Sequence, residues 1–177
     1  FAVVEPGVIL ADLQAAIDSE GLFYPPDPTE WSCQIGGTVA TNASGARSFK
    51  YGATREFVRR LTVVLASGEI VDLRRGDSVS DVSGQITLKT RDGREITAKV
   101  PTYDRPNVRK NVSGYYNGQP WDAIDIFIGS EGTLGVIAEI ELALLPKPEA
   151  FFSGIVFFQD GSQLLSFVEE AKKRSFA

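Results

Sequence analysis

The sequence has 177 residues, 43% of them apolar, which suffices for one domain with a sizeable core, or for one domain and the start of a second. Its 18 basic and 23 acidic residues give a formal net charge of -5, which disfavours nucleic acid as the main partner. A single cysteine excludes an intrachain disulfide framework, and no apolar run reaches the roughly 20 residues of a membrane helix. We therefore expect a globular, cytoplasmic protein without a membrane span.

Two residue types are absent from the sequence, and both absences bear on function. Without methionine, Phe1 cannot be the start of an open reading frame, so we expect the chain to be a piece of a longer protein. Without histidine, the chain lacks the commonest general acid/base and the commonest metal ligand near neutral pH. We therefore predict no catalytic residue and no metal site within it.

The first part of the chain predicts a strand, a turn and a helix. Residues 1–4 are apolar and run into a Pro-Gly turn, and leucine and isoleucine recur at helical spacing over 9–20. The prolines of 25–28 lack the amide donors that a helix or a sheet interior needs. That stretch is expected to be a rigid loop or a cofactor wall.

Residues 35–45 are nearly all small, which lets the backbone come close to something bulky. Gly36-Gly37 permits close approach of a ligand, and a helix starting there would direct free amides toward a phosphate. The alternative that spacing leaves open is a tight crossing of two backbones. The run is neither a Walker A loop nor a Rossmann glycine motif.

Antiparallel strands are predicted next. Residues 60–73 form a hairpin around Ser67-Gly68, and residues 85–100 form a second hairpin around Asp92-Gly93. The polar segment 101–120 has no assignment.

The last third of the chain predicts a short helix, two strands and a longer helix. The helix covers 121–128, the strands cover 134–145 and 151–158, and the longer helix covers 162–174. The Pro-Lys-Pro linker between the two strands is typical of a domain boundary. The elements together predict an α+β fold, in which a mainly antiparallel sheet is flanked by helices and followed by the start of a second domain.

Four motifs follow one another along the chain: Pro25–Pro28, Cys33–Ala43, Lys50–Gly52 and Ile128–Ile137. Their order resembles that in FAD-linked oxidases of the glycolate oxidase and D-lactate dehydrogenase type. The chain thereby resembles the vanillyl-alcohol oxidase superfamily, which has a PCMH-type FAD-binding domain. The resemblance implies that residues 1–148 are a partial FAD-binding domain without its N-terminal subdomain. It also implies that residues 149–177 begin the C-terminal substrate or cap domain.

The same resemblance implies FAD as the cofactor, held weakly or not at all by this chain alone. In such proteins the glycine-rich segment lies along the pyrophosphate and flavin, and the Gly-Ser-Glu-Gly-Thr-Leu-Gly segment supports the cofactor further along. The cofactor-binding residues so implied are Pro26, Ser32, Cys33, Gly36, Gly37, Thr38, Thr41, Asn42, Tyr51, Glu131, Gly132, Gly135 and Ile137. Relatives with a flavin-linked cysteine place it six residues before the glycine pair. Cys33 lies three residues before the pair, so we interpret it as a non-covalent wall residue.

Several residues admit two interpretations. Glu131 could bind a ribose hydroxyl, or it could cap a turn by accepting backbone amides. Tyr115, Tyr116 and Trp121 could line a substrate path, although aromatic residues in a loop more often anchor that loop on a core.

Charged residues further along the chain also admit two interpretations. Arg105, Arg109 and Lys110 could hold a substrate carboxylate through charge-assisted bonds, but we favour a solvated cationic loop. Asp122 and Asp125 could form a carboxylate pair, but we favour an exposed helix face.

The resemblance implies an FAD-dependent oxidase or dehydrogenase that oxidises a small 2-hydroxy acid or related alcohol by hydride transfer to flavin. Its partners would be a small-molecule substrate and a separate electron acceptor. One alternative is a non-catalytic flavin-binding or electron-transfer subunit with an iron–sulfur partner protein or domain. Another is a peptidoglycan-precursor reductase. We expect the chain alone to be inactive.

Overall fold

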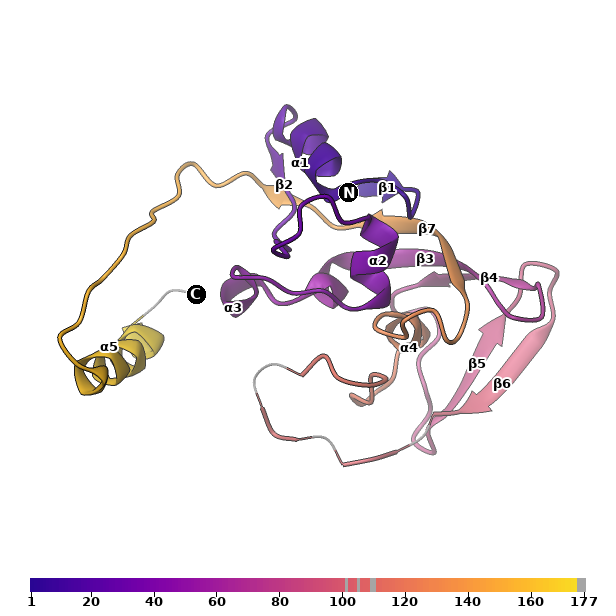
Figure 1. Ribbon diagram of the computed structural model, residues 1–177. Coiled ribbons are helices and arrows are strands. Elements are labelled where there is room, and N and C mark those ends of the chain that lie inside the picture. The colour runs from indigo at the N-terminus through magenta and orange to yellow at the C-terminus, as the bar shows by residue number, and fades with distance from the viewer. Residues whose placement is uncertain (101, 105, 109–110, 175–177) are drawn as a thin grey trace.

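The computed structural model describes residues 1–100, 102–104, 106–108 and 111–174. Its centre is an antiparallel sheet of four strands in the order β1-β7-β3-β4 (Figure 1). The strands are β1 (Ala2–Val4), β3 (Val58–Val64), β4 (Ile70–Arg74) and β7 (Val136–Leu142). The first strand therefore pairs with the last strand of the sheet, and the predicted hairpin of residues 60–73 is confirmed as β3 and β4.

Smaller elements surround this sheet. The helices are α1 (Leu10–Asp18), α2 (Ile35–Ala40), α3 (Ser48–Tyr51), the 3-10 helix η1 (Thr54–Phe57) and α4 (Ala123–Phe127). The other strands are β2 (Leu22–Phe23), β5 (Gln85–Lys89), β6 (Glu95–Lys99) and β8 (Leu145–Pro146), which pair as β2 with β8 and β5 with β6. The predicted hairpin of residues 85–100 is therefore confirmed, as is the α+β class.

The core lies between the sheet and the short helices. Its fully buried side chains include Leu10 of α1, Ile35 of α2, Leu61 of β3, Ile124 of α4 and Ile140 of β7. Burying such aliphatic side chains contributes about 1.5–3 kcal/mol each relative to exposure. Because α2 has only six residues, packing rather than helix propensity holds it in place.

The predicted strand of residues 134–145 is interrupted in the structure. β7 ends at Leu142, and the amide of Ala143 donates to the carbonyl of Phe57 at 2.7 Å. The chain then leaves the sheet, and Leu145 pairs with Phe23 in the separate β2–β8 ladder. The apolar alternation of the sequence continues through both ladders and does not reveal the change of partner.

The prediction of a strand over residues 151–158 is wrong. These residues are extended but form no ladder, and Phe152 and Phe157 are almost fully exposed. An extended segment needs a neighbouring strand for its amides and carbonyls, and no described strand lies beside it.

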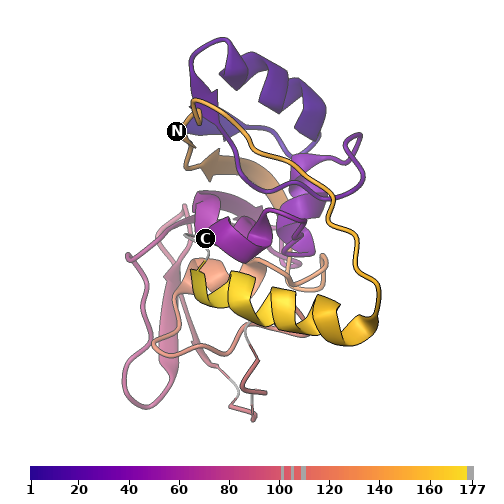
Figure 2. The same ribbon diagram turned by 90° about the vertical axis from the view of Figure 1, so that its left-hand side faces the viewer.

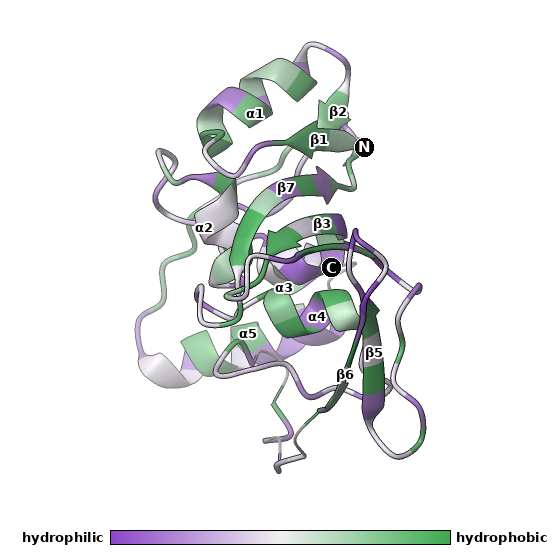
Figure 3. Cartoon of the chain, turned by 90° about the vertical axis from the view of Figure 1, so that its right-hand side faces the viewer, coloured by the Kyte–Doolittle hydropathy of each residue, from purple (hydrophilic) through white to green (hydrophobic). Residues whose placement is uncertain are grey.

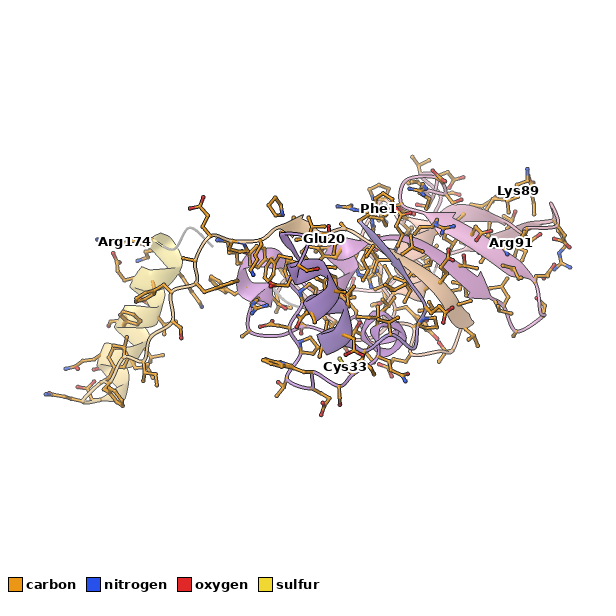
Figure 4. All side chains as sticks on the ribbon, turned by 90° about the horizontal axis from the view of Figure 1, so that it is seen from above. Phe1, Glu20, Cys33, Lys89, Arg91 and Arg174 are labelled. Atoms are coloured by element: carbon orange, nitrogen blue, oxygen red, sulfur yellow. The ribbon has the colours of Figure 1, made fainter. Side chains whose placement is uncertain are left out.

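The predicted final helix is confirmed as α5 (Gly161–Arg174), which buries none of its described side chains. Figure 1 shows it apart from the sheet, at the end of the extended segment, and in Figure 2, seen from that side, it lies in front of the other elements. Figure 4 places Arg174 on the opposite side of the molecule from Lys89 and Arg91 in the β5–β6 hairpin. None of the described helices is both long enough and apolar enough to cross a membrane.

Candidate functional site

The end of α2 and the turn of residues 129–132 lie against each other. The amide of Gly129 donates to the carbonyl of Val39 at 3.0 Å, and the amide of Glu131 donates to the carbonyl of Ala40 at 2.8 Å. These bonds satisfy carbonyls that the end of a helix otherwise leaves without partners. Two motifs that are far apart in the sequence therefore form one structural unit.

The start of α2 differs from the expectation of free amides. The amide of Ile35 donates to the carbonyl of Val8 at 2.9 Å, and the amide of Gly36 donates to the carbonyl of Pro6 at 2.8 Å. A Cβ atom on Gly36 would lie 2.5 Å from the Cβ of Pro6, whereas one on Gly37 would meet no atom within 4 Å. Of the two glycines, Gly36 is required for backbone packing and Gly37 leaves open space beside the chain.

The polar residues that follow the glycine pair make internal bonds. Thr38 Oγ1 donates to the carbonyl of Ile35 at 2.8 Å, and Thr41 Oγ1 donates to the carbonyl of Gly37 at 2.9 Å. Asn42 is buried, its φ of 48° is left-handed, and its Oδ1 accepts the amide of Arg55 at 3.0 Å. Thr38 and Asn42 therefore hold the backbone in shape, while Thr41 lies at the surface.

Three predicted residues lie before α2. Pro26 is buried, whereas Ser32 is exposed and its hydroxyl donates to Glu30 at 2.6 Å. Cys33 is half-buried, its carbonyl accepts the amide of Leu10 at 2.9 Å, and burial raises the pKa of its thiol. Figure 4 shows Cys33 beside α1.

The remaining predicted residues have different environments. Tyr51 packs edge-on against Phe23, with 5.9 Å between the ring centroids. A Cβ atom on Gly135 would lie 2.7 Å from Val63, so this glycine also serves packing, and Ile137 pairs with Val63 in the sheet. Glu131 and Gly132 are exposed, and both have positive φ angles, 53° and 78°.

A cleft of about 560 Å³ opens beside the end of α2, within the range of about 300–1,000 Å³ for small-molecule sites. Its walls come from residues 42–56 and from residues 111–116, and include Ser44, Gly45, Gly52 and Ala53. Asn42 is the one predicted cofactor-binding residue in its described lining. For the other residues of the 42–56 wall, the sequence signal was the run of small side chains that follows the glycine pair.

A buried ion cluster lies under this cleft. Arg55 Nη1 donates to Asp125 Oδ1 at 2.8 Å, and Arg75 donates to both carboxylate oxygens of Asp125 at 3.0 Å. Burial lowers the pKa of Arg55, and its hydrogen bonds to Asp125 oppose this shift. A buried charge is tolerated when it is paired in this way.

The prediction that Asp122 and Asp125 face solvent is therefore wrong, because both are buried. Asp122 caps α4 by accepting the amide of Ile124 at 3.4 Å, and its other oxygen accepts the amide of Gly76 at 2.7 Å. Sequence spacing did not indicate the arginines that make burial of these carboxylates possible.

Tyr115, Tyr116 and Trp121 were expected either to line a substrate path or to anchor their loop on the core, and the structure gives them different positions. Trp121 is 2% exposed and packs against Gly84, so it anchors the loop on the core. Tyr116 lines the cleft with its ring 4.3 Å from the guanidinium carbon of Arg55. The Tyr115 hydroxyl lies 2.6 Å from Thr133 Oγ1.

The predicted cationic group of the same loop, Arg105, Arg109 and Lys110, lies outside the described residues.

Residues 1–74 match the family model of an FAD binding domain. The chain is 38% identical over 157 residues to D-lactate dehydrogenase of Anaerostipes hadrus, covering 89% of this chain and 25% of that protein. It is 38% identical over 149 residues to glycolate oxidase subunit GlcD of Bacillus subtilis, covering 84% of this chain and 24% of that protein. The identity to D-2-hydroxyglutarate dehydrogenase of Stutzerimonas stutzeri is 32% over 148 residues, covering 83% of this chain and 24% of that protein. The chain thus spans about a quarter of the length of these relatives.

Among solved structures, alkyldihydroxyacetonephosphate synthase aligns with a TM-score of 0.52 and 21% identity, over 84% of this chain and 20% of that chain. At this identity the similarity concerns the fold alone. Residues 1–74 therefore belong to an FAD binding domain, with FAD as the cofactor, and the chain is similar in sequence to enzymes named D-lactate dehydrogenase and glycolate oxidase subunit GlcD.

Proposed function

We propose that the chain is the FAD-binding part of a longer enzyme that oxidises a small 2-hydroxy acid or related alcohol. The observation that carries the proposal is the meeting of α2, the turn of residues 129–132 and the cleft in one place. Open backbone at Gly37, an exposed turn and a cleft with small side chains together fit a large planar cofactor with a phosphate tail. Relatives named for D-lactate, glycolate and D-2-hydroxyglutarate support the class of substrate.

Within this proposal the predicted cofactor-binding residues have two roles. Gly37, Thr41, Glu131 and Gly132 lie at the surface where α2 meets the turn, and they would contact the cofactor directly. The others would shape the backbone that the cofactor contacts. They are Pro26, Ser32, Cys33, Gly36, Thr38, Asn42, Tyr51, Gly135 and Ile137.

When bound, FAD supplies the acceptor for the hydride that leaves the substrate carbon. The described residues of the chain would hold the cofactor, restrict water in the cleft and orient the substrate. The chain has no histidine, and the buried carboxylates Asp122 and Asp125 are occupied by arginines and backbone amides. Glu56 lines the cleft but is exposed to solvent. We place the base that removes the hydroxyl proton outside residues 1–177.

The boundary between domains belongs to the same proposal. Residues 1–148 would form part of the FAD-binding domain, and residues 149–177 would begin the substrate domain. The exposed apolar side chains of the extended segment and α5 support this assignment, because such surfaces normally pack against another structure. Figure 3 shows apolar residues along α5.

Retention of FAD by the full-length enzyme tests the proposal. We expect yellow, stoichiometric flavoprotein after gel filtration and dye-linked oxidation of at least one of the three acids. Gly37→Val should abolish FAD retention while the far-UV circular dichroism stays unchanged, because the branched side chain fills the cofactor's approach path. A full-length enzyme without flavin would contradict the proposed function, and a Gly37→Val variant with a wild-type flavin spectrum would contradict the placement of the cofactor.

A second candidate rests on the name of one relative, which is a subunit of glycolate oxidase. In this version the chain belongs to a flavin-binding subunit that passes electrons to an iron–sulfur partner protein. Co-purification of an iron-containing subunit, with its iron–sulfur signal reduced when the 2-hydroxy acid is added, would favour this assembly. An isolated polypeptide with full turnover would exclude it.

A further inference from the structure

Arg55 connects parts of the cleft that are distant in the sequence. Its side chain is 11% exposed, and its Nη1 donates to the carbonyl of Asp125 at 2.6 Å as well as to the carboxylate of that residue. Its Nη2 donates to the carbonyl of Ile128. Both carbonyls belong to the end of α4, directly before the turn of residues 129–132, so the guanidinium fixes the point at which that turn begins.

The backbone of Arg55 holds the opposite side of the cleft. Its amide donates to Asn42 Oδ1, and the preceding residue, Thr54, donates through its amide to the carbonyl of Ala43 at 3.0 Å. Asn42 in turn lies where a Cβ on Gly129 would approach at 3.4 Å. One residue therefore contacts the end of α2 through its backbone and the start of the turn through its side chain.

The third element at Arg55 is the loop of residues 111–117. The Tyr116 ring lies over the guanidinium, and Tyr116 lines the cleft together with Asn111 and Val112. The neighbouring Tyr115 is tied to the turn, because its hydroxyl lies 2.6 Å from Thr133 Oγ1, which donates to the carbonyl of Ser130. The loop thus rests on both Arg55 and the turn.

We propose that Arg55 is the positioning residue of the cofactor cleft. Its backbone amide holds the end of α2, and its guanidinium holds both the chain directly before the turn of residues 129–132 and the loop of residues 111–117. The inference rests on the proposed function in assigning the cleft to FAD. Arg55 itself need not contact the cofactor. A lysine at this position keeps the positive charge, but its single ammonium cannot reproduce the planar fork that reaches two carbonyls and a carboxylate together.

The test uses the full-length enzyme in three forms: wild type, Arg55→Lys and the control Arg75→Lys. Arg75 binds the same carboxylate but lies outside the lining of the cleft and donates instead to the carbonyls of Val58 and Arg55. Quenching of flavin fluorescence gives the FAD dissociation constant. Hydrogen exchange in the enzyme stripped of flavin gives the protection of the Gly129 and Glu131 amides.

For Arg55→Lys we expect the FAD dissociation constant to rise at least about tenfold, the equivalent of one charge-assisted hydrogen bond, and the two amides to exchange faster. Arg75→Lys should leave both quantities near wild type. The proposal is overturned if Arg55→Lys matches wild type, or if both variants change equally, since equal changes would report general loosening of the ion cluster.

Two further outcomes are separable. If Arg55→Lys does not fold, Tyr116→Leu decides, because it removes the ring over the guanidinium without touching the buried bonds. An unchanged FAD dissociation constant in Tyr116→Leu would contradict the proposal. If the wild-type enzyme binds no FAD, the proposed function fails, while the exchange of the Gly129 and Glu131 amides still shows whether Arg55 holds the turn.

Discussion

Gly36 and Gly37 are neighbours on one helical turn, yet the same substitution should change stability in opposite directions. A methyl group on Gly36 would place its Cβ 2.5 Å from Cβ and 3.1 Å from Cα of Pro6, where carbon atoms pack at about 3.5–4.0 Å. The proline ring cannot rotate aside, so overpacking should cost about 1–3 kcal/mol, against about 0.5–1 kcal/mol gained by removing a helical glycine. Gly36→Ala should therefore lower the free energy of unfolding by about 0.5–2 kcal/mol.

Gly37→Ala should instead raise the free energy of unfolding by about 0.5–1 kcal/mol, because its Cβ would meet no atom within 4 Å. Urea unfolding of both variants, followed by circular dichroism and compared at equal m-value, measures the difference. If the two variants have equal stability, or if Gly37→Ala is the weaker, then α2 does not pack on the Pro6 turn as described, and the division of roles between the two glycines is refuted.

Three other predictions concern the ion cluster, the thiol and the chemistry. Asp125→Asn should lower the free energy of unfolding by about 3–5 kcal/mol, because two largely buried arginines lose their shared countercharge. Asp72→Asn, at the more exposed ion pair with Arg91, should lower the free energy of unfolding by no more than about 1 kcal/mol. If urea unfolding gives equal losses for Asp125→Asn and Asp72→Asn, the burial assigned to Asp125 is contradicted. Burial raises the pKa of the Cys33 thiol, so at about pH 8 a smaller fraction of Cys33 than of glutathione is thiolate. Iodoacetamide should therefore react more slowly with Cys33 than with glutathione, and the rate should increase as the pH is raised. Equal rates for the two thiols at about pH 8 would show that Cys33 is open to solvent. With added FAD, the chain alone should not oxidise D-lactate, glycolate or D-2-hydroxyglutarate, since it has no histidine, the commonest general base. Turnover above the free-flavin background would assign the base to one of its carboxylates, of which Glu56 lines the cleft.

Local patterns predicted most of the elements correctly. Apolar residues at helical spacing predicted α1 and α5, and alternation with a central turn predicted both hairpins, because these signals depend on neighbouring residues. The extended segment of residues 151–158 shows the limit of such patterns. Its apolar residues satisfy strand propensity, but a strand also needs a partner, and strand propensity does not specify one.

The sequence motifs predicted which segments form the candidate site. They did not predict the buried ion cluster beside it. The small residues around Gly37 and the turn at Gly132 were identified, and the structure brings these two segments together. Asp125 looked like a surface residue because its partners, Arg55 and Arg75, come from elements far away in the sequence. An isolated charge pattern indicates solvent exposure by default, and it takes the three-dimensional fold to supply the countercharge.

The pairing of β1 with β7 also affects how the chain can fold during synthesis. Ala2 pairs with Leu142, so 140 further residues must be synthesised after Ala2 before β1 can pair with β7. At about 5–20 residues per second, that delay is roughly 7–28 seconds. β3 and β4 can pair once Arg74 has been made, and from then on β1 and the free edge of β3 present unsatisfied amides and carbonyls. A ribosome-bound nascent chain is therefore most vulnerable to wrong pairing before Leu142 emerges, and it is at this stage that a chaperone would have the most to protect.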